Sequence, residues 1–126
     1  MTEPVSEGDS FSHSRTFTES DFETFAELSR DRGEHHFETD DGRVMVHGLL
    51  TATLPTKIGS DLNYVARQME FEFIKPVYTG EEIECVLTAN SVTEREEFVE
   101  LEATGECTNE AGEVVLEFET AGVIFT

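Results

Sequence analysis

One stretch of the sequence restricts the possible folds more than any other. Residues 44–58 (VMVHGLLTATLPTKI) are apolar or small at most positions and carry no charge before Lys57. This stretch is long for a buried strand, and it is not flanked like one. A helix that is apolar on all sides has to be buried. We therefore expect a buried helix here, bent or shortened at its far end by Pro55.

The second half of the chain alternates apolar and polar residues. In 67–75 (RQMEFEFIK), Met69, Phe71 and Phe73 fall on one face, and a glutamine and two glutamates fall on the other. The same pattern of period two recurs further along the chain, in 82–93, 97–107 and 113–125, and more loosely before the apolar run, in 11–17. It predicts antiparallel strands with one dry face and one solvated face.

These elements fit together in one way. Four or five long antiparallel strands that share an apolar face can curl around one apolar helix. The expected fold class is therefore α+β: a hot-dog fold, in which an antiparallel β-sheet is wrapped around a central buried helix. One sheet does not cover such a helix completely, so we expect a second copy of the chain, in a homodimer or a higher homo-oligomer.

The length and the remaining segments suggest one domain. The chain has 126 residues, of which 37% are hydrophobic, enough for a single core. We expect a flexible N-terminal tail over residues 1–10 and a single domain over 11–126. A first helix is predicted to begin after Thr18, whose spacing from Asp21 is typical of a capping box, and to end near Arg30–Gly33, where the glycine is a natural stop.

The charge balance is extreme, and it excludes some kinds of partner. The chain has 28 acidic and 8 basic residues, for a net charge of −20. Such a chain lacks the basic face that nucleic acid or an anionic membrane requires. The acidic residues are interleaved with apolar ones, which argues against a disordered acidic tail. Few lysines and many carboxylates are typical of proteins that work at very high salt; an ordinary acidic protein is the alternative.

The two cysteines and the N-terminal residues indicate the cellular compartment in which the protein is expected. Cys85 and Cys107 fit no metal-ligand spacing and no disulfide framework. We expect buried free thiols in a reducing cytoplasm, with a single cross-strand disulfide as the alternative. The first ten residues lack the basic and apolar segments of a signal peptide, and no stretch approaches the length of a membrane span.

A few residues between the first helix and the apolar run are suited to acid–base chemistry. Asp31 and His36 are close enough in a loop to turn toward one point, where they would activate a water. Gly48, near the start of the predicted buried helix, offers a backbone N–H to an oxyanion. Each residue also has a plain structural interpretation: a surface Asp31, a solvated pair of histidines at 35 and 36, a core His47 and a glycine that permits close packing.

Three segments in order resemble one family. Residues 29–36 (SRDRGEHH) are similar to the Ser-Gly-Asp-x-Asn-Pro-x-His segment of the MaoC-like dehydratases, the (R)-specific enoyl-CoA hydratases. Residues 46–50 (VHGLL) resemble the Val/Ile-His-Gly-Met-Leu opening of their hot-dog helix, and 71–81 (FEFIKPVYTGE) resemble their Phe-x-x-Pro-Val-x-x-Gly-Asp strand and turn. With the flanking elements, the resemblance covers about residues 11–125.

The resemblance implies catalytic roles for Asp31, His36 and Gly48. The family's catalytic Asp and His fall on the first two, and its oxyanion glycine falls on the third. The implied reaction is the syn hydration of a trans-2-enoyl thioester to the (R)-3-hydroxyacyl product, or the reverse dehydration. Family members act as dimers on acyl-CoA or acyl-carrier thioesters and use no metal or redox cofactor.

Substrate-binding roles are expected for three further residues. Thr56 falls where many members place a hydroxyl near the catalytic pair, and His47 lies beside Gly48. We also expect Arg67 to line the path of the CoA phosphates, together with some of the few other cations near the motifs, Arg43, Lys57 and Lys75.

Two departures from the family pattern leave other activities open. Gly33 and Glu34 replace the family's Asn-Pro, and the loop from His36 to His47 is shorter than usual. The alternatives are a hot-dog acyl-CoA thioesterase, which also uses a carboxylate and a helix N-terminus, and a non-catalytic module that binds acyl thioesters.

Overall fold

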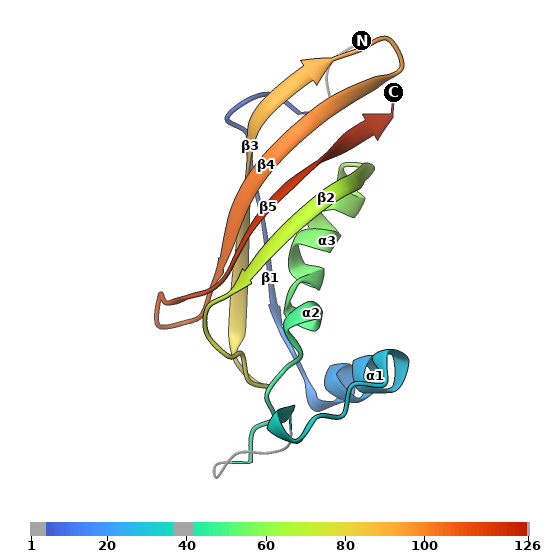
Figure 1. The fold of residues 1–126 in the computed structure, drawn as a ribbon. Helices are drawn as coiled ribbons and strands as arrows, with labels where there is room; N and C mark the ends of the chain where they lie inside the picture. The colour runs from blue at the N-terminus through green and yellow to red at the C-terminus, as the bar shows by residue number, and fades with distance from the viewer. Residues whose placement is uncertain (1–4, 37–41, 126) are drawn as a thin grey trace.

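The computed structural model describes residues 5–36 and 42–125, which form one curved antiparallel sheet with helices on its concave side. The strands, in the order β1-β3-β4-β5-β2, are β1 (Ser10–Thr16), β2 (Tyr64–Phe73), β3 (Glu82–Glu94), β4 (Phe98–Thr108) and β5 (Val114–Phe125). The helices are α1 (Glu19–Ser29), the short 3₁₀ helix η1 (Glu34–His36), α2 (Gly48–Thr51) and α3 (Thr53–Asp61). Figure 1 shows α3 held against the sheet and α1 at one end. A sheet wrapped around a helix confirms the expected α+β hot-dog fold.

The core lies between α3 and the concave face of the sheet. Leu54 and Ile58 of α3 are almost fully buried, as are Ile83, Leu101 and Leu116 from three neighbouring strands. The alternation predicted for β3, β4 and β5 is therefore confirmed, because their apolar residues point to the helix and their glutamates to solvent.

The apolar run 44–58 does not form a single helix, which corrects the sequence prediction. Its first three residues are extended, because the N–H of Val46 donates to Val77 (2.7 Å) and Val44 accepts from the N–H of Thr79 (2.9 Å). Apolar content marks a segment as buried, but it does not distinguish a helix from a strand that finds backbone partners. The helix consequently begins only at Gly48, at the pocket described below.

The helical part of residues 44–58 also differs from the prediction in where it ends and in how far it is buried. Pro55 does not end it: the run is interrupted at Ala52, between α2 and α3, and Pro55 lies in the first turn of α3, where no N–H is required, so α3 continues to Asp61. The helix is not buried on all sides either: Leu49 is 61% exposed, and Thr56 and Lys57 face solvent.

The N-terminal segment matches its prediction only in part. Thr18 and Asp21 form the expected capping box, and α1 ends within the expected region, at Ser29, with Arg30 as its C-cap in a left-handed conformation (φ 65°). Of the residues expected in the N-terminal tail, Val5 is fully buried in the core, the N–H of Gly8 donates to the carbonyl of Ala89 (2.8 Å), and Ser10 begins β1. Residues 1–4 lie outside the described chain.

The apolar face predicted for β2 is not dry in a single chain. Met69 is 41% exposed and Phe73 is 53% exposed, and Val65 and Ile74 are similarly open. β2 is an edge strand of the sheet, so among residues 5–36 and 42–125 one of its two long sides has no neighbouring strand. The face of β2 is apolar, as the alternation predicts, but a single copy of the chain does not bury it.

The cysteines are free and buried, as expected, and the alternative disulfide is absent. Cys85 and Cys107 lie directly opposite each other on β3 and β4. The hydrogen bond between the two thiols and their burial raise the pKa of Cys107, so this thiol stays protonated. In the described ranges 5–36 and 42–125, no helix has both the length and the apolar composition needed to cross a membrane.

Candidate active site

A pocket of about 640 Å³ lies where the segment after α1 meets the start of α2 and the end of β2. Asp31, His36, His47 and Gly48 all line it, so the structure brings together the residues that the sequence placed in two separate motifs. Apolar side chains, including Phe25, complete most of the wall. The pocket is therefore a mainly apolar chamber with a small polar cluster.

Asp31 is held by one hydrogen bond at its backbone and one at its carboxylate. Its N–H donates to the hydroxyl of Ser29 (3.2 Å), and its carboxylate Oδ1 accepts from the N–H of Gly33 (3.2 Å). The hydrogen bond from Gly33, with smaller contributions from the nearby histidines, lowers the pKa of Asp31 below its usual value. The group is thus an anion near neutral pH, with its other oxygen free to face His36.

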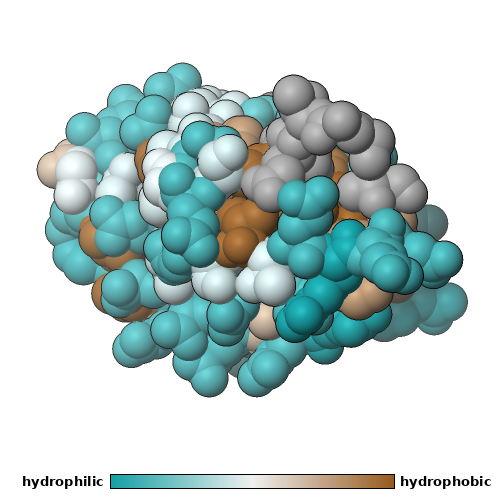
Figure 2. All heavy atoms as spheres, turned by 90° about the horizontal axis from the view of Figure 1, so that it is seen from above, coloured by the Kyte–Doolittle hydropathy of each residue, from teal (hydrophilic) through white to brown (hydrophobic). Residues whose placement is uncertain are grey.

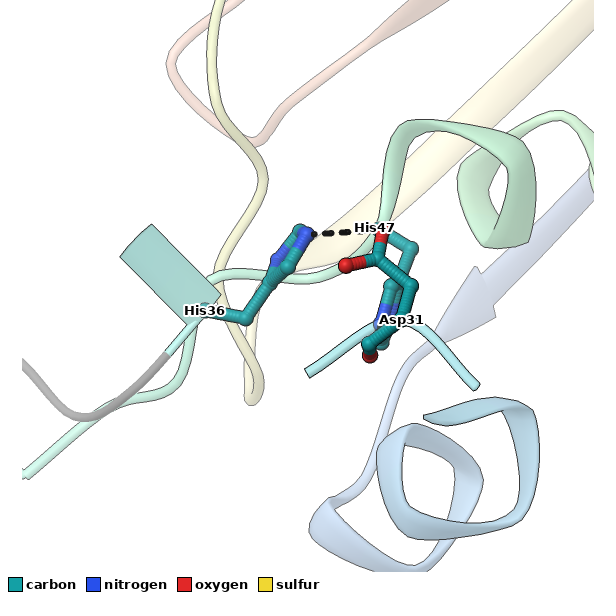
Figure 3. Close-up of side chains that lie close together, drawn as sticks. All are labelled: Asp31, His36 and His47. Atoms are coloured by element: carbon teal, nitrogen blue, oxygen red, sulfur yellow. Dashed lines mark hydrogen bonds and ion pairs between the residues drawn. The ribbon is translucent and has the colours of Figure 1, made fainter. Parts of the chain in front are cut away.

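His36 faces Asp31 with the nitrogen that carries a lone pair. The Nδ1 atom lies 2.9 Å from the carbonyl oxygen of Met45, and since a carbonyl only accepts, Nδ1 carries the proton. In the neutral ring the Nε2 atom is then an acceptor, and it lies 3.5 Å from Oδ2 of Asp31 (Figure 3). His36 is almost fully buried, whereas the Asp31 side chain is half exposed. Two acceptors at this distance are suited to share a proton or a water.

His47 contacts both Asp31 and His36 and holds them in place. Its Nε2 atom donates to the backbone carbonyl of Asp31 (2.8 Å), which ties the Asp31 loop to the start of α2. The ring is buried and stacks on His36, with centroids 4.1 Å apart, and on Phe22 at 5.0 Å. His47, for which a substrate-binding role was expected, thus lines the pocket and also fixes the position of Asp31.

The three side chains also have the composition of a metal site. One ligand atom from each of Asp31, His36 and His47 lies within 4.8 Å of the others. However, the planes of the two imidazoles are only 28° apart. The in-plane lone pairs of stacked rings do not converge on one point, as tetrahedral ligands of zinc must. The arrangement is better suited to acid–base chemistry.

Gly48 occupies the position expected of an oxyanion donor. It is the first residue of α2, so its N–H has no acceptor within the helix. The ring of Phe73 lies against its α-carbon: a Cβ added at Gly48 would lie 2.7 Å from Cε1 of that ring. Gly48 is therefore also the residue that lets this ring approach, as its structural interpretation had suggested.

Two predicted binding residues are not brought to the pocket. Thr56 is exposed, and its hydroxyl donates to the carbonyl of Ala52 (3.0 Å). Arg67 lies in the first half of β2, with its guanidinium carbon 5.9 Å from the centre of the Phe98 ring. The hydroxyl residues that do line the pocket are Ser29 and Thr51, of which Thr51 is buried and lies on the same helical segment as His47. The spacing of four residues between His47 and Thr51 is the signal that could have indicated Thr51.

The other cations are placed as follows. Lys75 lines the pocket and pairs with Glu113, Lys57 pairs with Asp61, and Arg43 packs over the ring of Tyr78 (4.4 Å).

Known proteins resemble this chain over nearly its full length. No family model matches it. A curated (R)-specific enoyl-CoA hydratase from Rhodospirillum rubrum is 31% identical over 134 residues, covering 97% of this chain and 90% of that protein. The chain belongs to the (R)-specific enoyl-CoA hydratase family of MaoC-like dehydratases. It is accordingly an enzyme of the hydro-lyase class.

Solved structures of hydratases share the fold of this family member. An (R)-hydratase from A. caviae superposes with a TM-score of 0.84 at 21% identity, covering 99% of this chain and 100% of that one. R-hydratase PhaJ1 from Pseudomonas aeruginosa gives 0.82 at 18% identity, covering 96% and 82%. The MaoC-like dehydratase from Rhodospirillum rubrum gives 0.79 at 19% identity, covering 98% and 94%.

The two departures from the family's motifs have different consequences. Gly33 keeps the local geometry, because its N–H binds Asp31 and a side chain there would collide with His35, whose Cε1 lies 2.7 Å from the position of an added Cβ. Glu34 opens η1 and is exposed, so its charge points to solvent. Residues 37–41 of the short loop before His47 lie outside the described residues.

Proposed function

We propose that this protein catalyses the reversible, (R)-specific addition of water to trans-2-enoyl thioesters. The observation that carries the proposal is the pair of opposed acceptors, Oδ2 of Asp31 and Nε2 of His36, 3.5 Å apart in an apolar pocket. The likeness to a curated (R)-specific enoyl-CoA hydratase supports the substrate class.

In the proposed mechanism the pair holds the reacting water. A water molecule has two hydrogens, so it can donate one to Asp31 and one to His36 and direct its lone pair at the substrate. The water oxygen bonds to C3 as the pair takes one proton, and the electrons of the C2=C3 bond move onto the thioester oxygen. The N–H of Gly48 donates to that developing oxyanion. The proton then passes to C2 on the same face as the thioester carbonyl re-forms.

The experiment that tests this proposal is a crotonyl-CoA assay in molar salt. We expect the enoyl absorbance to fall without release of free thiol, when both are followed in one cuvette, and chiral analysis to identify (R)-3-hydroxybutyryl-CoA. Thiol release would instead make the protein a thioesterase. Saturable binding without either signal would favour a module that only binds acyl thioesters. Acyl-carrier thioesters, assayed in parallel, show which carrier the enzyme accepts.

We also propose that a second copy of the chain covers the exposed apolar face of β2. The exposed residues there are large and apolar, and they lie on an edge strand whose outer backbone groups have no strand partner in one chain. We expect a dimer by light scattering in molar salt. Met69→Lys should weaken it, whereas Glu97→Lys, in the exposed turn between β3 and β4, should not. A monomer at micromolar concentration would contradict the proposal.

A further inference from the structure

Phe73 occupies an unusual place for a large aromatic residue. It ends the edge strand β2, and 53% of its surface is exposed. Its ring nevertheless lies directly against Gly48, since a Cβ added to that glycine would lie 2.7 and 2.8 Å from two of its carbons. The ring therefore contacts the backbone position of the pocket to which the proposed mechanism assigns the oxyanion.

The neighbours of the Phe73 ring leave about half of its surface exposed. Phe71, the nearest aromatic residue on the same strand, has its ring centroid 6.1 Å away. Leu49, which follows Gly48, is 61% exposed, and it lines the pocket together with Phe73. Phe73 thus forms an outer wall of the pocket, with one part toward the site and the rest exposed in a single chain.

The Phe73 ring is expected to lie beside the C2 atom of the substrate. If the thioester oxygen accepts from the N–H of Gly48, it lies about 3 Å from that nitrogen. The C2 atom is bonded to the same carbonyl carbon, so it also lies near Gly48 and the ring that covers it. A substituent on C2 would have to share this space with Phe73, whereas the far end of the acyl chain would not.

We infer that Phe73 is a specificity-determining residue that admits linear enoyl thioesters and excludes those branched at C2. This inference rests on the proposed hydratase activity, because it uses the position that Gly48 gives to the thioester. It concerns the thioester end of the substrate only.

The test compares crotonyl-CoA with its C2-methylated homologue, trans-2-methylbut-2-enoyl-CoA. In Phe73→Ala we expect the ratio of kcat/KM for the branched to the linear substrate to rise on the order of tenfold. Phe73→Leu, which keeps an apolar side chain on the strand, should give a smaller rise in the same direction. Val65→Ala is the control and should keep the wild-type ratio, because Val65 is a similarly exposed apolar residue of β2 that does not line the pocket. An unchanged ratio in both Phe73 variants overturns the inference.

A second readout separates this inference from the hydratase proposal. The chain has no tryptophan, so Phe73→Trp introduces a single tryptophan at the wall, which can be excited selectively over the two tyrosines. We expect its emission to change on titration with butyryl-CoA, which is saturated and cannot react. Phe98→Trp, at the opposite end of the sheet, is the control and should not respond.

The outcomes distinguish the two claims. Turnover with neither a change in selectivity nor an emission response overturns the role of Phe73 and leaves the hydratase standing. An emission response without turnover of any enoyl thioester supports the wall beside the ligand and overturns the hydratase. Absence of both overturns both.

Discussion

Asp31→Asn is expected to reduce kcat for hydration by about 10³-fold, the size of effect associated with the loss of a general acid–base group. Asparagine has the same shape and keeps an oxygen that can accept the N–H of Gly33, which now binds Oδ1 at 3.2 Å. The loop should therefore keep its form, and the variant should still bind butyryl-CoA. What it loses is the negative oxygen that faces Nε2 of His36.

The effect of Asp31→Asn can be measured at neutral pH without interference from titration of Asp31. The hydrogen bond from Gly33 and the neighbouring histidines lower the pKa of Asp31, so the wild-type carboxylate is ionised throughout the neutral range. The activity that depends on this anion is present above its pKa and is lost only as the pH falls through it. A comparison at pH 7 to 8 therefore contrasts a charged side chain with a neutral one of equal size.

A matched control is available at Asp61. This carboxylate is exposed at the end of α3 and pairs with Lys57, away from the pocket. Asp61→Asn makes the same chemical change and should retain wild-type turnover. Full activity in Asp31→Asn, with its circular dichroism and melting temperature unchanged, would remove Asp31 from the mechanism and leave His36 without the proposed partner.

The features that were predictable from the sequence are those set by local pattern. Period-two alternation indicated β3, β4 and β5 because both faces of a strand can be read from neighbouring residues. The capping box of Thr18 and Asp21 was likewise visible, since its two residues bind each other's backbone across three positions. The meeting of Asp31 and His36 was expected because one short loop joins them.

The features that were missed depend on contacts between distant segments. Residues 44–46 are extended because of backbone hydrogen bonds to 77–79. The ring of Phe73 reaches Gly48 across 25 positions of sequence. Likewise, Val5 is buried only because the sheet lies beneath it. None of these contacts leaves a periodic trace in the residues themselves.

The charge of the sheet's outer face leads to a second large expected effect, a strong dependence of stability on salt. Hydrophilic side chains cover most of the end of the molecule that carries both termini (Figure 2). On the outer face of the sheet, glutamates lie directly opposite glutamates: Glu117 faces Glu72 on one side and Glu106 on the other, and Glu119 faces Glu70. All five are exposed. Like charges in directly opposed positions oppose strand pairing.

Salt should weaken this repulsion. Opposed side chains are about 5 Å apart at Cβ, which is within the screening length of roughly 10 Å at 0.1 M salt but beyond that of roughly 3 Å at 1 M. At about 0.2–1 kcal/mol for each of the three opposed pairs, we expect these contacts alone to add about 0.6 to 3 kcal/mol to the free energy of unfolding between low and molar salt. Urea denaturation at a series of KCl concentrations measures this change.

The role of the opposed glutamates can be isolated from that of the net charge of −20. Glu117→Gln removes two like-charge contacts at once, so at 0.1 M KCl it should stabilise the protein by about 1 kcal/mol, and the gain should disappear in molar KCl. Glu97→Gln changes the net charge equally, but it lies in an exposed turn outside the strand register, so its gain should be smaller. Equal effects of the two variants would attribute the salt dependence to net charge alone. A free energy of unfolding that did not rise with KCl would contradict both explanations, and with them the expectation of a protein adapted to high salt.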